Sequence, residues 1–208
     1  MEKKRLIIMF GAPGSGKGMI GDALVQAFGF QKISTGDILR DEVKKQTPLG
    51  CLVAEYVSNG LLVDDDIVNN IVKNLLNGSS QDVLLDGYPR NFAQCDFLLA
   101  LTDDDFELHC VYLEAPEELI IARIEQRRIC ADCGKTHLAQ DGCCPACGGE
   151  SIIRKDDAQI RERFNQYKWI TEQVFWKRLY PVCCFTDFID CSDLKKATDR
   201  AIDAFTPF

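Results

Sequence analysis

The stretch from Phe10 to Gly21, FGAPGSGKGMIG, contains the residue types of a phosphate-binding loop. Its glycines let backbone N–H groups turn towards an anion, and Lys17 adds a positive charge beside them. A Walker loop would continue with Ser or Thr, but Gly18 and Met19 follow the lysine here. The stretch therefore predicts a phosphate site with one hydroxyl ligand missing. A glycine-rich turn without a ligand is the alternative.

Two Cys-x-x-Cys pairs, CADC and CPAC, lie close together in the chain, and a glycine follows each pair. Two such pairs on a short hairpin predict a tetrahedral Zn²⁺ site with Cys130, Cys133, Cys144 and Cys147 as ligands. Cys143 is an alternative ligand to Cys144. Four thiolates leave no open position for water, so the metal would be structural. Redox-active dithiols and a nucleic-acid zinc ribbon are the other interpretations.

A carboxylate, Asp86, ends the apolar run Val83 to Leu85. An acidic residue at the end of a buried strand facing a phosphate loop is suited to holding Mg²⁺ through water. A capping role is the alternative for this side chain. Asp86 is therefore the candidate magnesium residue.

The composition excludes several classes of protein. The chain has 208 residues, 46% of them hydrophobic, enough for one core with small appended lobes. A net charge of −8 argues against a general nucleic-acid binder. The sequence has no apolar run of about 20 residues, and its N-terminal apolar run is too short for a signal peptide. We expect a cytoplasmic protein that binds neither nucleic acid nor membranes, with its 11 cysteines outside a disulfide framework.

Apolar runs and helical periodicity alternate along the chain. Strands are predicted at Arg5–Phe10, Val83–Asp86, Glu107–Pro116 and Phe188–Asp190. Helices are predicted from the phosphate loop to Phe28, with Gly29 as the C-cap, and at Asp66–Leu76, Glu117–Gln126 and Ala158–Leu179. This alternation predicts a parallel sheet that is covered by helices on both faces.

Two segments interrupt the alternation. Ser34 to Val63 is polar and helical, with no evident core strand. Ile129 to Ile153 is rich in Cys and Gly and poor in large apolar residues. A segment of that composition needs a metal or a partner surface in order to fold.

A series of motifs resembles the adenylate kinase family. The matching stretches are GAPGSGKGMI, STGDILR, GLLVDD, LDGYPRNFAQ, RIEQRRIC and RKDD, in the order of the family and near its spacings. In that family Gly normally follows the loop lysine and Thr comes next, so the departure is Met19 alone. The resemblance is to long-lid members, some of which carry a four-cysteine zinc site in the lid.

The resemblance implies an α/β P-loop kinase fold. Its parallel, mostly five-stranded sheet is flanked by helices, and a small helical lobe for the nucleoside monophosphate and a zinc-containing lid are added to it. The implied boundaries are 1–33, 64–125 and 158–208 for the core, 34–63 for the lobe and 126–157 for the lid. The lobe and the lid contain the two segments that interrupt the alternation.

The implied activity is reversible, Mg²⁺-dependent phosphoryl transfer from ATP to AMP, giving two ADP, by a monomeric enzyme. Thr35 and Gln94 match the adenylate type, whereas the related uridylate–cytidylate kinases carry Ala and Asn there. Two alternatives stay open. One is a nucleoside monophosphate kinase that uses GTP as the donor, and the other is a non-catalytic or weakly active, zinc-stabilised nucleotide-binding protein.

The resemblance also implies roles for individual residues. Those implied to bind ATP are Gly14, Ser15, Gly16, Lys17, Gly18, Met19, Arg123, Arg127, Thr136, His137 and Asp193. Those implied to bind AMP are Thr35, Arg40, Leu61, Leu62, Val63, Gly87, Tyr88, Pro89, Arg90, Gln94, Arg154 and Arg163. Those implied to act in transfer are Lys17, Arg90, Arg127, Arg154 and Arg163, with Asp156 and Asp157 orienting the arginines.

Two of these assignments stay open. The segment from RKDD to the next matching arginine is two residues shorter than in the family. Either Arg161 or Arg163 could therefore fill the role of that arginine. Side chains two positions apart on a helix point about 200° away from each other around its axis, so the two arginines cannot face the same way. His137 could bind the donor nucleotide, cap a cysteine knuckle or face solvent.

Overall fold

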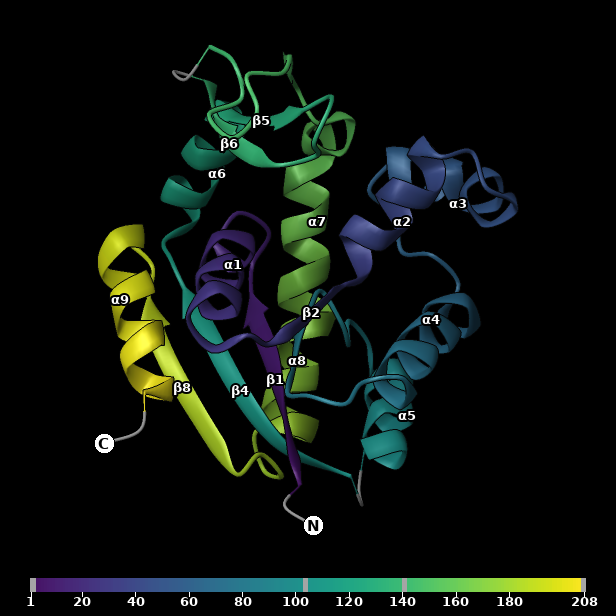
Figure 1. The fold of residues 1–208 in the computed structure, drawn as a ribbon, viewed down its shortest axis with the longest axis vertical. Coiled ribbons are helices and arrows are strands. Elements are labelled where there is room, and N and C mark those ends of the chain that lie inside the picture. The colour runs from purple at the N-terminus through teal and green to yellow at the C-terminus, as the bar shows by residue number, and fades with distance from the viewer. Residues whose placement is uncertain (1–2, 103–104, 140–141, 207–208) are drawn as a thin grey trace.

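A five-stranded parallel sheet forms the centre of the molecule in the computed structural model (Figure 1), which describes residues 3–102, 105–139 and 142–206 and omits the side chains of residues 155 and 156. The strands are β1 (Lys4–Gly11), β2 (Gln31–Ser34), β3 (Val83–Asp86), β4 (Phe106–Glu114) and β8 (Phe185–Asp190). Their order is β2-β3-β1-β4-β8. The predicted fold class is confirmed, with β2 as a strand that the sequence did not predict.

Alternating side chains of β1 form the two halves of the core. Ile7 and Met9 pack on one face of the sheet with α1 (Lys17–Phe28) and α9 (Leu194–Phe205). Leu6, Ile8 and Phe10 pack on the other face, which α4 (Asp65–Asn77) and α5 (Phe92–Thr102) cover. The sheet is buried on both faces because successive residues of a strand point in opposite directions.

The remaining core helices connect the sheet to the upper part of the molecule. They are α6 (Glu117–Gln126) and a continuous helical run of η2 (Lys155–Gln159), α7 (Ile160–Gln166), η3 (Tyr167–Thr171), α8 (Glu172–Val174) and η4 (Phe175–Leu179). Ile120 and Ile124 of α6 pack on Phe164 and Tyr167 of the run. This contact fixes α6 and α7 where both approach the lid, and the helix predicted over 158–179 is confirmed.

Two helices, α2 (Thr35–Lys44) and α3 (Pro48–Ser58), form a lobe beside the sheet. The Ser34 hydroxyl accepts a hydrogen bond from the backbone N–H of Asp37, and Thr47 caps α3 through Gly50 N–H at 3.0 Å. Both caps satisfy donors that a helix N-terminus leaves unpaired. The lobe thus begins directly after β2 and places its first helix beside the end of the sheet.

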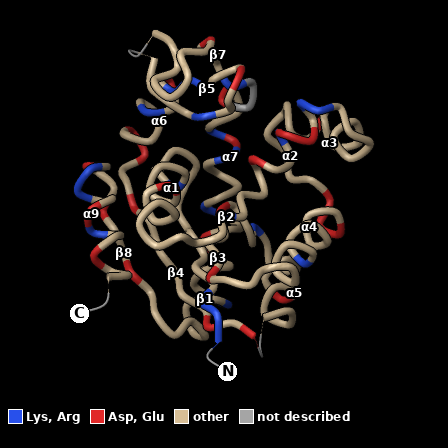
Figure 2. The backbone as a smooth tube through the Cα atoms, viewed as in Figure 1, with Lys and Arg blue, Asp and Glu red and all other residues tan. Residues whose placement is uncertain are grey.

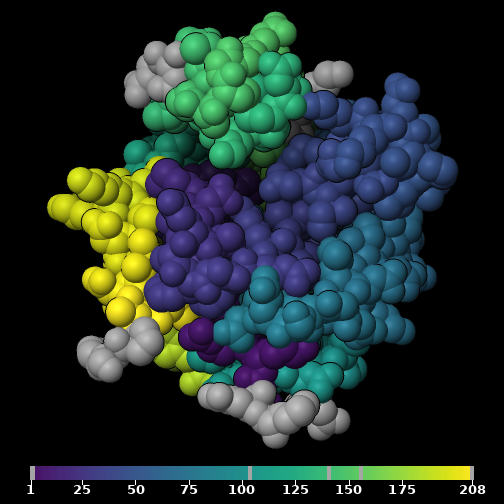
Figure 3. All heavy atoms as spheres, viewed as in Figure 1, coloured from purple at the N-terminus to yellow at the C-terminus, as the bar shows by residue number. Residues whose placement is uncertain are grey.

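Three short antiparallel strands form the lid: β5 (Arg127–Cys130), β6 (Thr136–Leu138) and β7 (Ser151–Ile152). In Figure 3 the lid lies above the phosphate-loop region, and the helical lobe lies beside both. Lys44 Nζ, on α2, donates to the carbonyl oxygens of Ala131 and Asp132 at 2.7 Å and 3.0 Å. The lobe and the lid are therefore in direct contact.

Charged residues of both signs are interspersed over the lid, the lobe and α9 (Figure 2). Within the described ranges, every helix is too short or too polar to cross a membrane.

Candidate active site

The phosphate loop connects β1 to α1 at the carboxyl end of the sheet. Its first glycine, Gly11, has a φ of +146°, and a Cβ there would lie 2.8 Å from the carbonyl oxygen of Leu113. Any side chain at that position would therefore collide with β4. The geometry explains why the loop begins with glycine as it leaves the strand.

Lys17 folds back over this loop. Its Nζ donates to the carbonyl oxygens of Gly11 at 2.7 Å and of Ala12 at 2.9 Å. Burial lowers the pKa of Lys17 to about 8, the Asp86 carboxylate opposes that shift, and Arg90 adds to it. The lysine thus sits among cations in a site whose electrostatics favour an incoming anion.

Two further loop features bear on phosphate binding. The Ser15 side chain is fully buried, and among the described residues its hydroxyl has no hydrogen-bond partner. Met19 lies on the first turn of α1, is 47% exposed and lines the cleft. The residue that replaces the expected threonine therefore faces the open site and not the core.

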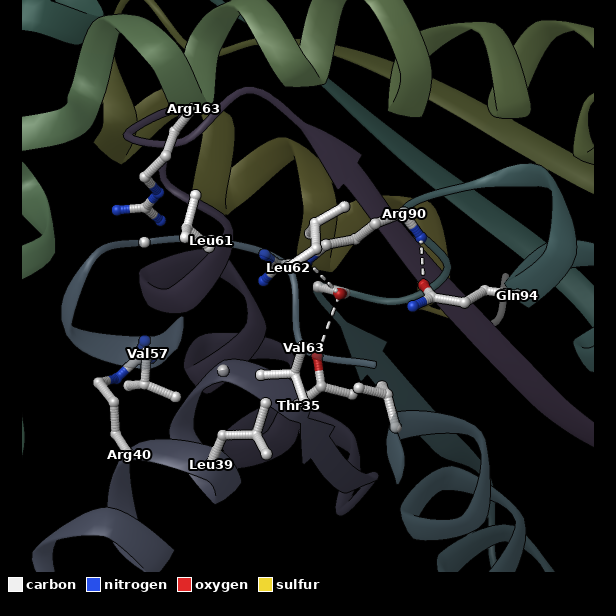
Figure 4. A pocket seen from close by; sticks show the side chains of 14 residues that line it. Thr35, Leu39, Arg40, Val57, Leu61, Leu62, Val63, Arg90, Gln94 and Arg163 are labelled. Carbon is white, nitrogen blue, oxygen red and sulfur yellow. Dashed lines mark hydrogen bonds between the residues drawn. The ribbon is translucent and has the colours of Figure 1, made fainter. Parts of the chain in front are cut away.

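A pocket beside the loop is lined by most of the residues predicted to bind AMP, namely Thr35, Arg40, Leu61, Leu62, Val63, Gly87, Arg90, Gln94 and Arg163. In Figure 4 the guanidinium groups of Arg40 on α2, Arg90 in the loop after β3 and Arg163 on α7 point towards the same space. Three cations around one cavity would attract a phosphate, and the forked arginine side chain matches its oxygens.

The floor of this pocket is held by hydrogen bonds to one carbonyl group. The carbonyl oxygen of Gly87 accepts from Thr35 Oγ1 at 3.0 Å and from Arg90 Nε at 2.7 Å. Gly87 itself has a φ of +79°, and a Cβ there would lie 3.1 Å from Arg90 Nη2. The turn that follows β3 therefore brings a lobe residue and a core arginine to the same point.

The Gln94 side chain is almost fully buried at the edge of the pocket, and both ends of its amide have partners. Its Oε1 accepts from the backbone N–H of Arg90 at 2.8 Å, and its Nε2 donates to Asp65 Oδ1 at 2.7 Å. Sequence reasoning did not identify Asp65. The residue lies in an acidic run at a helix start, which is a common capping pattern, and Gln94 is 29 positions away.

Tyr88 and Pro89, also predicted to bind AMP, line the larger cleft. The Tyr88 ring points into the core, because only 1% of the residue is exposed and its hydroxyl lies 2.6 Å from Asn69 Oδ1. An AMP contact at Tyr88 would therefore involve its backbone.

Cationic side chains from the lid and α7 meet above the loop. Arg127 forms a salt bridge with Asp157 through both its Nε and its Nη2, and Arg163 Nη1 lies 3.9 Å from the same carboxylate. Arg163 lines the cleft, as Arg154 does, whereas Arg161 is exposed on another side of the helix. The structure thus places Arg163, and not Arg161, at the candidate site. The side chain of Asp156 lies outside the described residues.

The residues predicted to contact the donor nucleotide differ in their surroundings. Thr136 is exposed and lines the cleft. His137 lines the cleft as well, but its ring is buried in the lid and does not face solvent. Its Nε2 hydrogen-bonds the Ser151 hydroxyl, and its Nδ1 lies 3.4 Å from the carbonyl oxygen of Lys135, beside the first cysteine pair. The interior position explains the hydrogen bond, because a buried polar ring needs a partner.

Arg123 and Asp193 lie near the end of β8. Arg123 lines the cleft and donates from Nη2 to the carbonyl oxygens of Cys191 at 2.6 Å and Ser192 at 3.2 Å. The Asp193 carboxylate caps α9 by accepting from the backbone N–H groups of Lys195 and Lys196. Asp193 therefore has a capping role here.

The four predicted cysteine ligands come together in the lid. The sulfur atoms of Cys130, Cys133, Cys144 and Cys147 all lie within 4.8 Å of one another. The Sγ atoms of Cys130 and Cys147 are 3.5 Å apart, and those of Cys133 and Cys144 are 3.6 Å apart. A tetrahedral zinc site with Zn–S bonds of about 2.3 Å would separate its sulfurs by about 3.8 Å. The cluster therefore fits Zn²⁺, with Cys144 buried in it and Cys143 exposed outside it.

The thiols of this cluster influence each other. The backbone N–H of Cys133 donates to Cys130 Sγ and, with that of Asp132, lowers the pKa of Cys130 to about 6. The backbone N–H of Gly149 acts to lower the pKa of Cys147, but the neighbouring Cys133 and Cys130 thiols raise it to about 12. Four thiolates can coexist there only with a cation between them.

A single cleft of about 1480 Å³ joins the loop, the pocket and the lid. It exceeds the roughly 300–1,000 Å³ typical of a pocket for one small molecule. Asp86, at the end of β3, and Lys17 lie on its floor, and Arg90 and Arg163 line both this cleft and the smaller pocket. The geometry accommodates two ligands whose charged ends meet at the arginines.

Comparison with known proteins gives matches over most of the chain. The family model for adenylate kinase matches residues 9–177. An adenylate kinase of Caldicellulosiruptor saccharolyticus is 43% identical over 175 residues, which cover 78% of this chain and 81% of that protein. One of Petrotoga mobilis is 40% identical over 178 residues, covering 81% and 82% respectively. One of Methanosarcina barkeri is 39% identical over 181 residues, covering 80% and 82%.

Proposed function

The chain belongs to the adenylate kinase family, and on that premise we propose that its cleft transfers the γ-phosphoryl group of ATP to AMP, giving two ADP. The main support for the proposal is the position of Arg90 and Arg163. Both line the smaller pocket, called the AMP-type pocket because residues predicted to bind AMP surround it, and both line the larger cleft above Lys17. Two nucleotides bound on either side of these arginines would have their phosphates adjacent.

On the acceptor side, Arg40, Arg90 and Arg163 bind the AMP phosphate. Leu61, Leu62 and Val63, together with Thr35 and Gln94, enclose the base and ribose. The Gln94 amide both donates and accepts, as the edge of adenine requires.

On the donor side, the loop from Gly14 to Met19 and Lys17 Nζ bind the ATP phosphates, Arg123 lies over the donor base, and Thr136 contacts the nucleotide from the lid. Asp86 would hold Mg²⁺ through water, since its carboxylate lies at the end of β3 beside the loop lysine. When bound, Mg²⁺ neutralises charge that develops on the transferred group.

In the transfer step, an AMP phosphate oxygen attacks the γ-phosphorus, and the bond to the β,γ-bridging oxygen breaks. AMP carries the nucleophile already ionised, so no protein base is needed. Lys17, Arg127, Arg154 and Arg163 compensate the charge, and Asp157 holds Arg127 in place. The closed lid excludes water and so prevents hydrolysis of ATP.

The cysteine cluster binds structural Zn²⁺ in this proposal. The sulfur spacing and the need for a cation among the thiols support it. Among the lid residues that the structure describes, the strands are short and few apolar side chains are buried, so the metal would replace a hydrophobic core.

A coupled assay that crosses donors (ATP, GTP) with acceptors (AMP, CMP, UMP, GMP) tests the proposal. We expect turnover with ATP and AMP well above every other pair. Rates with GTP that equal or exceed those with ATP would identify an enzyme that uses GTP as the donor. Nucleotide binding without ADP formation in zinc-replete protein would identify a non-catalytic binding protein.

A bivalent inhibitor, two adenosines joined through five phosphates, tests the two-site geometry. It should bind at least 100-fold more tightly than ATP or AMP, because linking two ligands makes the second binding step intramolecular. Affinity equal to that of one mononucleotide would contradict adjacent sites.

A further inference from the structure

Asp65 lies at the start of α4, two positions after Val63, which lines the AMP-type pocket. Its carboxylate accepts from Gln94 Nε2 at 2.7 Å and from Asn91 Nδ2 at 2.9 Å and 3.0 Å. Asn91 in turn accepts from the backbone N–H of Gln94 at 2.9 Å through Oδ1. Asp65 therefore holds Gln94 both directly and through a neighbour.

The contacts of Gln94 with Asp65 and Arg90 determine the positions of its amide oxygen and its NH₂ group. A carboxylate only accepts hydrogen bonds, so the amide NH₂ must face Asp65. A backbone N–H only donates, so the amide oxygen must face Arg90. The opposite orientation would set donor against donor and acceptor against acceptor in a buried place, which is costly. Figure 4 shows the Arg90 contact, with the amide at the edge of the pocket.

The Gln94 amide, once fixed in this way, can form only a few further hydrogen bonds. Of its two N–H groups and two oxygen lone pairs, one N–H and one lone pair are left. Adenine presents an amino donor beside a ring-nitrogen acceptor on its Watson–Crick edge, which this remainder complements. A 6-oxopurine presents an oxygen acceptor beside a ring N–H donor, which only the reversed amide would complement.

We propose that Asp65 is a positioning residue that makes the acceptor site select 6-aminopurine over 6-oxopurine nucleoside monophosphates. It acts by holding the Gln94 amide in one of its two orientations. The inference rests on the proposed function, in which Gln94 contacts the acceptor base. Asp65 itself does not line the pocket, so the effect must pass through Gln94.

The test compares AMP with IMP, because these two acceptors differ only at the 6-position and the adjacent ring nitrogen. In Asp65→Asn, the side chain can present either its oxygen or its NH₂ group to Gln94, so residue 65 no longer forces the Gln94 amide into one orientation. We expect the ratio of kcat/KM for AMP to that for IMP to fall about 5- to 50-fold, since a well-made bidentate contact discriminates bases by about that amount. KM for ATP should change less than twofold.

Asp66→Asn is the matched control. Asp66 is the next residue in the same helix turn, is exposed and loses the same charge. Its AMP/IMP ratio should equal that of the wild type. Because the ratio compares two substrates in one preparation, partial unfolding of either variant does not alter it.

A double-mutant cycle separates positioning from general support of the fold. In a Gln94→Ala background, Asp65→Asn should leave the AMP/IMP ratio unchanged, since the group that it orients is gone. An unchanged ratio in Asp65→Asn alone, or an equal fall in the Gln94→Ala background, would overturn the inference.

The proposed function can fail separately. If the wild type forms no ADP from ATP and AMP, the proposed reaction is contradicted. The affinities of the same variants for AMP and IMP, measured by calorimetry, then test the role of Asp65 without turnover. Equal affinities of the wild type for AMP and IMP would overturn the inference that this site selects 6-aminopurines.

Discussion

The AMP-type pocket and the lid perform the same task, which is to hold charged groups in place, by different physical means. In the pocket, Gly87, Gln94 and Asp65 form a network in which the buried polar groups that we described have protein partners. In the lid, Cys130 and Cys144 are buried, whereas Cys133 and Cys147 are exposed. The pocket is held in place by the adjoining core, whereas the lid has a group of four cysteines that could hold a metal.

The difference follows from what each region adjoins. Thr35 directly follows β2, and Arg90 lies four residues after the end of β3, whose side chains pack on both faces of the sheet. The lid touches the core through α6 and the start of the α7 run, and its strands are two to four residues long. Perturbing the pocket, the lid or the adjoining phosphate loop tests how independently the two regions are held in place.

The largest effect is expected from Arg90→Met, because Arg90 lines both the pocket and the larger cleft. We expect kcat to fall by at least about 10²–10³-fold, as when one charge-stabilising donor is removed from a transition state. Steady-state rates with saturating ATP and AMP measure it. Retention of more than a tenth of wild-type kcat would show that Arg90 is not in the transfer site. Arg161→Met, on an exposed side of the helix, is the control and should stay within twofold.

Metal removal should affect the lid strongly and the AMP-type pocket little. Chelator-treated protein should lose about 5–10 °C of Tm and most of its turnover, because binding energy in such sites is folding energy. AMP affinity, measured by calorimetry, should change less than twofold.

Cysteine variants give the matched comparison for this experiment. Cys144→Ser should reproduce the loss of Tm, whereas Cys143→Ser, one residue away and exposed, should not. Equal effects of the two substitutions, or an unchanged Tm on chelation, would contradict a structural zinc site.

The pH dependence of ATP affinity tests the donor side. Lys17 has a pKa of about 8 in the free protein, and bound phosphates raise it. Above pH 8 the free lysine is neutral, so binding requires a proton, and ATP affinity should fall up to tenfold per pH unit between 8 and 9.5. Calorimetry in buffers of different ionisation enthalpy measures the proton uptake. Lys17→Arg should abolish this dependence, since arginine stays charged.

The smallest effect is expected at Met19. Met19→Thr restores the hydroxyl typical of the family and should improve ATP affinity about 2- to 10-fold, the contribution of roughly one hydrogen bond. Met19→Val has nearly the shape of threonine without the hydroxyl, so it should show no gain. Identical kinetics for the two variants would mean that the site does not use this contact.

The sequence predicted the groups that lie along continuous motifs better than those brought together by the fold. The phosphate loop, the cysteine pairs and Arg90 could be located from local patterns. Strand β2 was missed because four residues of mixed polarity, with Ile33 alone fully buried, carry little periodicity. Helices α5 and α9 were missed as well.

The roles of Asp65, Arg163 and His137 depend on contacts between distant residues. Asp65 meets Gln94 across 29 positions, and the choice between Arg161 and Arg163 depends on the direction of one helix. The sequence left three surroundings open for His137, and its ring lies against Ser151 of another strand of the lid. Spacing along the chain does not determine such contacts.

The contact between Lys44 and the first cysteine knuckle has a consequence for how the products leave. Lys44 lies on the helix that carries Arg40, and its partners Ala131 and Asp132 lie between Cys130 and Cys133. Opening either the lobe or the lid breaks the same two hydrogen bonds. The departure of ADP from one site would therefore loosen the part that retains ADP in the other.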